Sequence, residues 1–152
     1  MIYHLLLGSN IEDPIRQIAI ATQRIAETFT LIRESSLQKS KAYGKTDQPD
    51  FYNRVLEIDS ALDPQCMMRE LLSLETALGR IRKEKWGPRK IDIDILLAQD
   101  MVIDSPDLKI PHYDLHNRAF ALRLLCELVP EAVHPIYNKT MRKLFEELAR
   151  RK

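Results

Sequence analysis

Two stretches of the sequence carry the same succession of signals, and this repetition constrains the fold more than any other feature. Each begins with an apolar run, at 2–7 and at 51–60, and each then reaches an Asp-Pro pair, at Asp13 and at Asp63. Apolar residues at helical spacing follow both pairs, and the second set ends at Gly79. Aspartate accepts hydrogen bonds from free N–H groups at a helix start, and proline is tolerated in the first turn. We therefore expect Asp13 and Asp63 to cap two amphipathic helices.

The order of the elements predicts an α+β fold. Strand, helix, strand, strand, helix, strand is the ferredoxin-like βαββαβ core, and one sheet with helices packed on it buries their apolar faces economically. The length of 152 residues suits one domain that spans 1–152. In chain order we expect strands at 2–7, 30–37, 51–60 and 91–97, a polar connection at 38–50, a basic loop at 80–90, additional short strands near 101–103 and 108–110, and two C-terminal helices at about 117–129 and 140–151.

Composition and charge exclude several classes of protein. Hydrophobic residues make up 45% and charged residues 30%, which excludes a disordered chain. There are 23 basic and 22 acidic side chains, and the net charge of +1 gives no reason to expect a nucleic-acid partner. Neither a membrane helix nor a secretory signal is indicated. Cys66 and Cys126 form no CxxC motif, so we expect small buried side chains in a cytoplasmic protein.

The run from Ile91 to Ile95 alternates isoleucine with aspartate. Alternate side chains of a strand share a face, so Asp92 and Asp94 point the same way, with Cα atoms about 7 Å apart. Two carboxylates about 5 Å apart repel by roughly 3 kcal/mol at an effective dielectric of about 20, and a cation between them would relieve this. Aspartates that act with a phosphate ligand are typical partners of Mg²⁺. The alternative is a half-exposed strand whose polar face happens to carry aspartate.

A basic loop leads directly into this aspartate pair. Cations beside a divalent-metal site are typical of a polyphosphate clamp, because both neutralise phosphate oxygens. Taken alone, a run of charges is more often only solvated. Trp86, the single tryptophan, is either a local packing residue or a lid over a ligand. The basic residues are Arg80, Arg82, Lys83, Lys85, Arg89 and Lys90.

Two further clusters suggest ligand contacts. His112, Tyr113 and Arg118 precede or begin a predicted helix, whose free N–H groups would suit an anion. The alternative is a polar connection in which Asn117 only caps the helix. Phe51 and Asn53 share a strand face, which suits a flat heterocycle that is stacked by the ring and read by the amide, although aromatic residues in strands more often belong to the core.

The whole chain resembles one enzyme family. The run Lys85-Trp86-Gly87-Pro88-Arg89-Lys90-Ile91-Asp92-Ile93-Asp94-Ile95-Leu96 is similar to the signature of the 6-hydroxymethyl-7,8-dihydropterin pyrophosphokinases. The similarity extends to Gly8-Ser9-Asn10, Gln48-Pro49-Asp50-Phe51 with Asn53, Glu75 with Gly79-Arg80-Ile81-Arg82, Pro111-His112-Tyr113 and Asn117-Arg118-Ala119-Phe120.

The resemblance implies a monomeric enzyme of folate biosynthesis. Such an enzyme transfers the pyrophosphoryl group of ATP to the hydroxymethyl oxygen of the pterin and releases AMP, with two Mg²⁺ ions and no nucleic-acid or membrane partner. An RNA-recognition module and a non-catalytic pterin or nucleotide sensor are the alternatives. The resemblance assigns Asp92 and Asp94 to the metal, Arg80, Arg89, Asp92 and Asp94 to catalysis, Glu75, Arg82, Trp86, Ile95, His112, Tyr113 and Arg118 to ATP, and Gly8, Phe51, Asn53 and Phe120 to the pterin.

Overall fold

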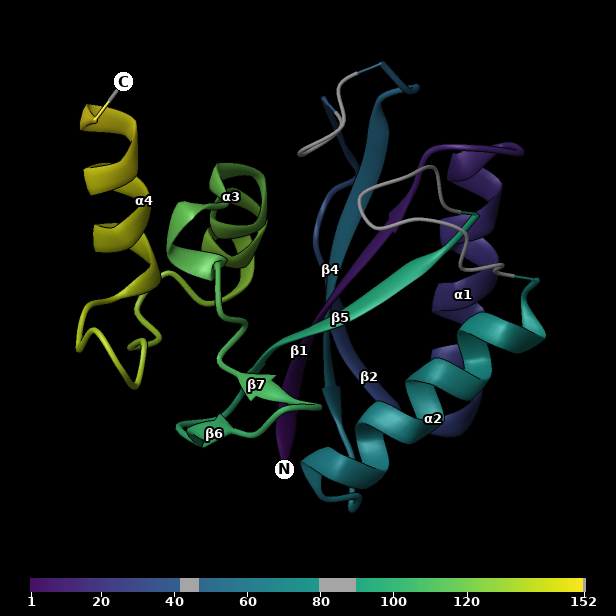
Figure 1. Cartoon of the computed structure of the whole chain (residues 1–152), viewed down its shortest axis with the longest axis horizontal. Helices are drawn as coiled ribbons and strands as arrows, with labels where there is room; N and C mark the ends of the chain where they lie inside the picture. The colour runs from purple at the N-terminus through teal and green to yellow at the C-terminus, as the bar shows by residue number, and fades with distance from the viewer. Residues whose placement is uncertain (42–46, 80–89, 152) are drawn as a thin grey trace.

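The computed structural model describes residues 1–41, 47–79 and 90–151 (Figure 1). The predicted order of elements is present, and in both Asp-Pro pairs the proline is the first residue of a helix and the aspartate stands directly before it. In chain order the elements are β1 (Ile2–Ser9), α1 (Pro14–Thr28), β2 (Thr30–Glu34), β3 (Gln38–Ser40), β4 (Phe51–Asp59), α2 (Pro64–Ala77), β5 (Asp92–Ala98), β6 (Ile103–Asp104), β7 (Lys109–Ile110), a 3-10 turn at Leu115–Asn117, α3 (Ala119–Leu128) and α4 (Met141–Arg150).

One antiparallel sheet organises the molecule. Its strand order is β2-β4-β1-β5, and β3 pairs with β4 beyond the end of β2. This order confirms the ferredoxin-like arrangement predicted from the sequence. It puts β1 in the middle, next to β5, and leaves β5 at an edge of the sheet within the described part of the chain.

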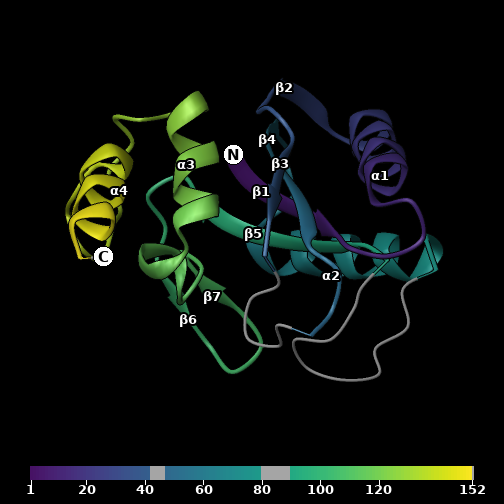
Figure 2. The same ribbon diagram turned by 90° about the horizontal axis from the view of Figure 1, so that it is seen from above.

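The two faces of the sheet are covered by different helices. Leu5 and Leu7 of β1 belong to the core shared with α1 and α2, whereas Leu6 belongs to the core shared with α3 and α4. Figure 2 shows α1 on one side of the sheet and α3 and α4 on the other. Alternate side chains of β1 therefore pack into two different cores, because both faces of the strand are buried. Within the described ranges, none of the helices combines the length and apolar character that a membrane crossing requires.

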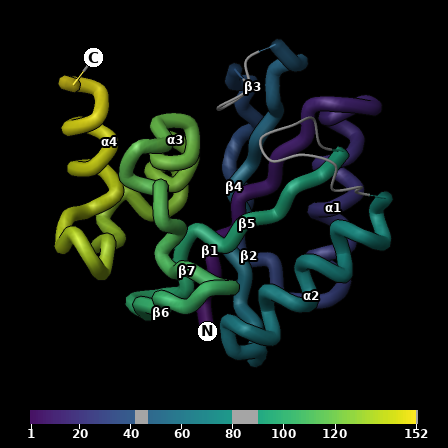
Figure 3. Tube along the Cα trace, in the orientation of Figure 1, coloured from purple at the N-terminus to yellow at the C-terminus, as the bar shows by residue number. Residues whose placement is uncertain are grey.

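The edge of β5 is flanked by α2 and by the β6–β7 hairpin, as the trace in Figure 3 shows. The segment that follows β7 also bonds the strand directly, since the backbone N–H of His112 donates to the carbonyl oxygen of Leu96 (3.0 Å). Two segments distant in the sequence thus border the strand that carries the aspartate pair.

The two Asp-Pro pairs differ in how they start their helices. Asp63 caps α2 as predicted: its backbone is extended (φ −72°, ψ 165°) and its carboxylate accepts from the N–H of Cys66 (2.8 Å). The prediction for Asp13 was wrong, because its side chain makes no capping hydrogen bond. Asp13 has a left-handed backbone (φ 63°, ψ 68°), and side-chain capping normally needs a residue in the extended region.

The strand predicted at 30–37 ends earlier than expected. β2 ends at Glu34, and β3 lies inside the stretch that was expected to be a polar connection. Between them, Ser36 donates through its N–H (2.8 Å) and its hydroxyl (2.6 Å) to the carboxylate of Glu127 on α3. These two hydrogen bonds link the segment between β2 and β3 to α3. The cysteines are half-buried and unpaired, not fully buried as expected.

Candidate active site

Asp92 and Asp94 lie on one face of β5, as the alternation predicted. In the register with β1 they stand opposite Gly8 and Leu6, while Ile93 and Ile95 enter the core under α1 and α2. Both carboxylates are half-buried, so they remain accessible to a ligand. Among residues 1–41, 47–79 and 90–151, no group of three or more His, Cys, Asp or Glu side chains could hold a metal. Two carboxylates fit Mg²⁺ only if phosphate oxygens and water complete its octahedral shell.

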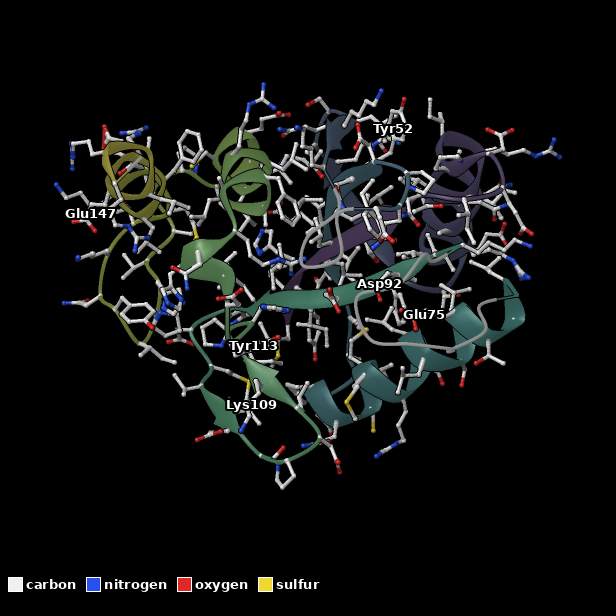
Figure 4. The ribbon with its side chains drawn as sticks, turned by 45° about the horizontal axis from the view of Figure 1, so that its top comes forward. Tyr52, Glu75, Asp92, Lys109, Tyr113 and Glu147 are labelled. Atoms are coloured by element: carbon white, nitrogen blue, oxygen red, sulfur yellow. The ribbon has the colours of Figure 1, made fainter. Side chains whose placement is uncertain are left out.

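A large cavity of about 620 Å³, here called the wide pocket, runs along the edge of β5. Its walls come from α2, from β5 and from the segment that leads out of β7. Figure 4 shows Glu75 and Asp92 near one another, with Tyr113 and Lys109 further along the strand toward the hairpin. The wide pocket brings together the described residues predicted for ATP and metal, namely Glu75, Asp92, Asp94, Ile95, His112, Tyr113 and Arg118.

A second cavity of about 40 Å³, here called the narrow pocket, lies on the α3 face of the sheet. It brings together the residues predicted for the pterin, namely Gly8, Phe51, Asn53 and Phe120. Asp92, Asp94 and Arg118 line both pockets. The aspartate pair therefore stands at the junction of the two cavities.

The walls of the narrow pocket are held tightly. Asn53 is 4% exposed; its Oδ1 accepts from the hydroxyl of Ser40 (2.9 Å) and its Nδ2 donates to the carbonyl of Leu7 (3.4 Å). A Cβ at Gly8 would lie 2.9 Å from Nδ2 of Asn53 and 3.6 Å from Cδ1 of Phe51. Glycine is needed at position 8 because any larger residue would push on the amide. Phe51 is 9% exposed, so it is part of the buried interior and of the pocket wall at once.

Arg118 connects the two pockets. Its Nη1 lies 3.8 Å from Oδ2 of Asp94, and its guanidinium lies 4.8 Å above the centre of the Phe120 ring. A cation over an aromatic face is attracted by the ring quadrupole. The side chain thus lies between the acidic junction and an aromatic wall.

His112 is a half-buried neutral residue in the wall of the wide pocket. Burial, then the nearby charge of Arg118, lowers the pKa of His112 to about 4. Its Nδ1 accepts from the N–H of Asp114 (3.2 Å), and its ring stacks on that of Tyr113 (4.8 Å between centroids). Tyr113 is 59% exposed and offers its remaining surface to solvent or to a ligand.

The helix predicted at about 117–129 is present but begins slightly later than expected. Residues Leu115–Asn117 form a 3-10 turn and α3 begins at Ala119. Nδ2 of Asn117 donates to the carboxylate of Asp114 (2.9 Å), so this side chain closes the turn before the helix and is not its cap.

The sequence reasoning missed the buried polar turn after β1. Ser9 and Asn10 are almost fully buried. The hydroxyl of Ser9 donates to the carbonyl of Lys90, and Nδ2 of Asn10 donates to Oε1 of Gln48 (2.8 Å) and to the carbonyl of Pro49 (2.9 Å). The Gly-Ser-Asn sequence indicated a turn, but it gave no sign of partners about 40 and about 80 positions away.

Four predicted residues, Arg80, Arg82, Trp86 and Arg89, lie outside the residues that the structure describes. The phosphate clamp and the lid assigned to them stay predictions.

Known proteins decide the family. The profile of the family described as 7,8-dihydro-6-hydroxymethylpterin-pyrophosphokinase (HPPK) matches residues 4–130. The chain belongs to this family. HPPK membership confirms the resemblance noted from the sequence signature.

Relatives of the HPPK chain cover most of its length. It is 40% identical over 134 residues to the 2-amino-4-hydroxy-6-hydroxymethyldihydropteridine pyrophosphokinase of Haemophilus influenzae. The aligned region covers 87% of this chain and 84% of that protein. The protein of the same name from Aquifex aeolicus is 40% identical over 144 residues, with 95% and 90% covered. Folic acid synthesis protein fol1 of Schizosaccharomyces pombe is 36% identical over 149 residues, which are 97% of this chain and 20% of fol1.

Solved structures agree with the fold. The wild-type HPPK-DHPS of Plasmodium falciparum superposes with a TM-score of 0.75 at 17% identity, covering 99% of this chain and 45% of that one. A triple mutant of the same protein with pteroate gives a TM-score of 0.81 at 18% identity, covering 99% and 42%. The chain therefore spans less than half of these longer proteins, and at this identity the likeness concerns the fold alone.

Proposed function

We propose that the chain transfers the pyrophosphoryl group of ATP to the hydroxymethyl oxygen of 6-hydroxymethyl-7,8-dihydropterin, giving the pterin diphosphate and AMP in folate biosynthesis. Membership of the HPPK family and the names of the relatives from Haemophilus influenzae and Aquifex aeolicus support this reaction. The observation that carries it is the junction of two unequal pockets at Asp92 and Asp94. A transfer between two substrates needs them to meet at one point, and holding them there supplies much of the rate.

On this proposal, Asp92 and Asp94 hold Mg²⁺. Bound there with ATP, the metal would neutralise charge that develops on the phosphate oxygens. The two carboxylates supply the hard oxygen ligands that such an ion prefers, and their half-exposed face leaves room for phosphate and water. Arg118, 3.8 Å from Asp94, would place a fixed positive charge beside the same phosphates.

The two substrates would occupy different pockets. ATP fits the wide pocket, where Ile95 offers an apolar wall, His112 and Tyr113 offer rings, and Glu75 comes from α2. The pterin would enter the narrow pocket, whose walls must first separate from the present volume of about 40 Å³; there Phe51 and Phe120 can stack a flat ring and Asn53 can bond its polar edge. On the family resemblance alone, we also propose that the chain acts as a monomer in the cytoplasm.

The function is tested by following AMP formation with the purified chain. AMP should appear only when ATP, Mg²⁺ and 6-hydroxymethyl-7,8-dihydropterin are all present, and a pterin diphosphate should form in equal amount. Omitting one component at a time is the control, and EDTA followed by excess Mg²⁺ should stop and restore the reaction. No AMP with all three present, or ADP in its place, would refute the proposal.

A further inference from the structure

A buried carboxylate on α2 bonds the strand that carries the aspartate pair. Glu75 is 3% exposed, and its Oε2 accepts the backbone N–H of Ile93 at 2.6 Å. Ile93 stands between Asp92 and Asp94 in the sequence, so the bonded amide belongs to the peptide segment that joins the two carboxylates. The contact is a short, charge-assisted hydrogen bond across two secondary-structure elements.

The location of this bond on the sheet explains why it matters. In an antiparallel ladder the N–H groups of successive residues point alternately to the two sides of the strand. β1 occupies one side of β5, and in the described part of the chain no strand occupies the other. The N–H of Ile93 points to this outer side, where Glu75 takes the place of a neighbouring strand.

A second contact holds the same outer edge further along. The N–H of His112 donates to the carbonyl of Leu96 at 3.0 Å. β5 is therefore held on its outer side by a side chain at Ile93 and by a backbone group at Leu96. Of the two, only the Glu75 bond lies within the aspartate pair, so it bears directly on the orientation of those carboxylates.

We propose that Glu75 is a positioning residue for the metal pair: it acts through the backbone of Ile93 and fixes the mutual orientation of Asp92 and Asp94. This rests on the proposed function, in which the pair holds Mg²⁺. The sequence resemblance assigned Glu75 to ATP, and the two roles predict different kinetics. Partners that orient metal ligands typically change metal affinity or activity by about 10- to 100-fold when removed.

Two substitutions separate the roles. Glu75→Ala removes the acceptor, whereas Glu75→Gln keeps a carbonyl oxygen that can accept the same N–H without charge. For Glu75→Ala, the Mg²⁺ concentration for half-maximal rate should rise by about tenfold or more and kcat should fall, while KM for ATP at saturating Mg²⁺ should change by less than about threefold. Glu75→Gln should recover most of the metal affinity. A raised KM for ATP with unchanged Mg²⁺ dependence and kcat would overturn the proposal and favour a nucleotide contact.

A second measurement needs no activity. Amide hydrogen exchange of Ile93, followed by NMR in the ligand-free protein, should be accelerated by about tenfold or more in Glu75→Ala and much less in Glu75→Gln. The matched control is Glu70→Ala, which removes an exposed carboxylate from the same helix and should change neither the exchange rate nor the Mg²⁺ dependence. Unchanged exchange at Ile93 in Glu75→Ala would contradict the proposal even if the enzyme turned out to catalyse another reaction.

Discussion

The wide and narrow pockets share Asp92, Asp94 and Arg118 but are built differently. The wide pocket has about 620 Å³ and follows a strand edge between α2 and the segment after β7, with exposed groups such as Tyr113 at its rim. The narrow pocket has about 40 Å³, and part of its wall is buried and fixed in place, at Gly8, Phe51 and Asn53, by close packing and hydrogen bonds. The first suits a long charged ligand, and the second suits a flat ring only after its walls separate. On the proposed function, one acidic junction would serve two chemically unlike substrates.

Removing both carboxylates of the junction should lower the rate more than any other change, because Asp92 and Asp94 line both pockets. The double variant Asp92→Ala, Asp94→Ala should lower the rate of AMP formation by roughly 10³-fold or more, because phosphate charge would lose its metal. Circular dichroism should show an intact fold, since both side chains are half-exposed. The matched control is Asp100→Ala, an exposed aspartate just after β5, which should leave the rate unchanged. A double variant with normal turnover would remove the aspartates from the mechanism.

A substitution confined to the narrow pocket should raise KM for the pterin and leave KM for ATP nearly constant. Phe51→Leu keeps an apolar side chain in the buried position but removes the stacking face. Stacking of an aromatic ring on a heterocycle contributes about 1–3 kcal/mol, so KM for the pterin should rise by roughly 5- to 150-fold while KM for ATP stays nearly constant. Steady-state kinetics with each substrate varied in turn measure both. Equal changes in the two KM values would show that the pockets are not separate sites.

Because His112 in the wall of the wide pocket is neutral, the free energy of unfolding should depend on pH. The pKa of His112 is lowered to about 4 by burial and by Arg118, against about 6.5 in the unfolded chain. Between these values the unfolded chain binds a proton that the folded chain does not, so the free energy of unfolding should decrease as the pH falls from about 6.5 to about 4. His112→Gln should reduce this decrease by about 2 kcal/mol in urea titrations at several pH values.

His134 should contribute in the same range, because burial also lowers its pKa to about 4. The pH dependence in His112→Gln should therefore be reduced and not abolished. An identical pH dependence in the variant and the parent chain would contradict the neutral, half-buried state assigned to His112.

The smallest effects should come from outside both pockets, at the two Asp-Pro pairs. Asp63→Ala should lower the free energy of unfolding by about 1 kcal/mol, because the bond to the Cys66 N–H is lost. Asp13→Ala should not show this loss, since the side chain of Asp13 makes no capping bond. Neither variant should change KM for ATP or pterin. Equal losses of stability in the two would mean that both aspartates cap in solution.

The same two aspartates show what could be predicted from the sequence. Element order and the shared face of Asp92 and Asp94 follow from local periodicity, so both were predictable. The left-handed backbone at Asp13 was not, because the Asp-Pro pair is identical at both helix starts and only the surrounding structure distinguishes them.

The remaining differences also come from contacts between distant residues. The early end of the second predicted strand lies close to the bonds of Ser36 to Glu127, 91 positions away, and the Glu75–Ile93 bond joins a helix to a strand edge. Neither is a local pattern. The narrow pocket was foreseen only in part: Phe51 and Asn53 shared a predicted face, but Ser40, which orients the amide of Asn53, lay in a predicted loop.

The central claim is that two substrates meet at Asp92 and Asp94. The most direct measurement is a crystal structure of the chain with a non-hydrolysable ATP analogue, Mg²⁺ and 6-hydroxymethyl-7,8-dihydropterin. We expect the nucleotide in the wide pocket, the pterin ring between Phe51 and Phe120, and Mg²⁺ bound by both carboxylates between them. Both ligands bound with the two carboxylates turned away and no ion at β5 would contradict the account.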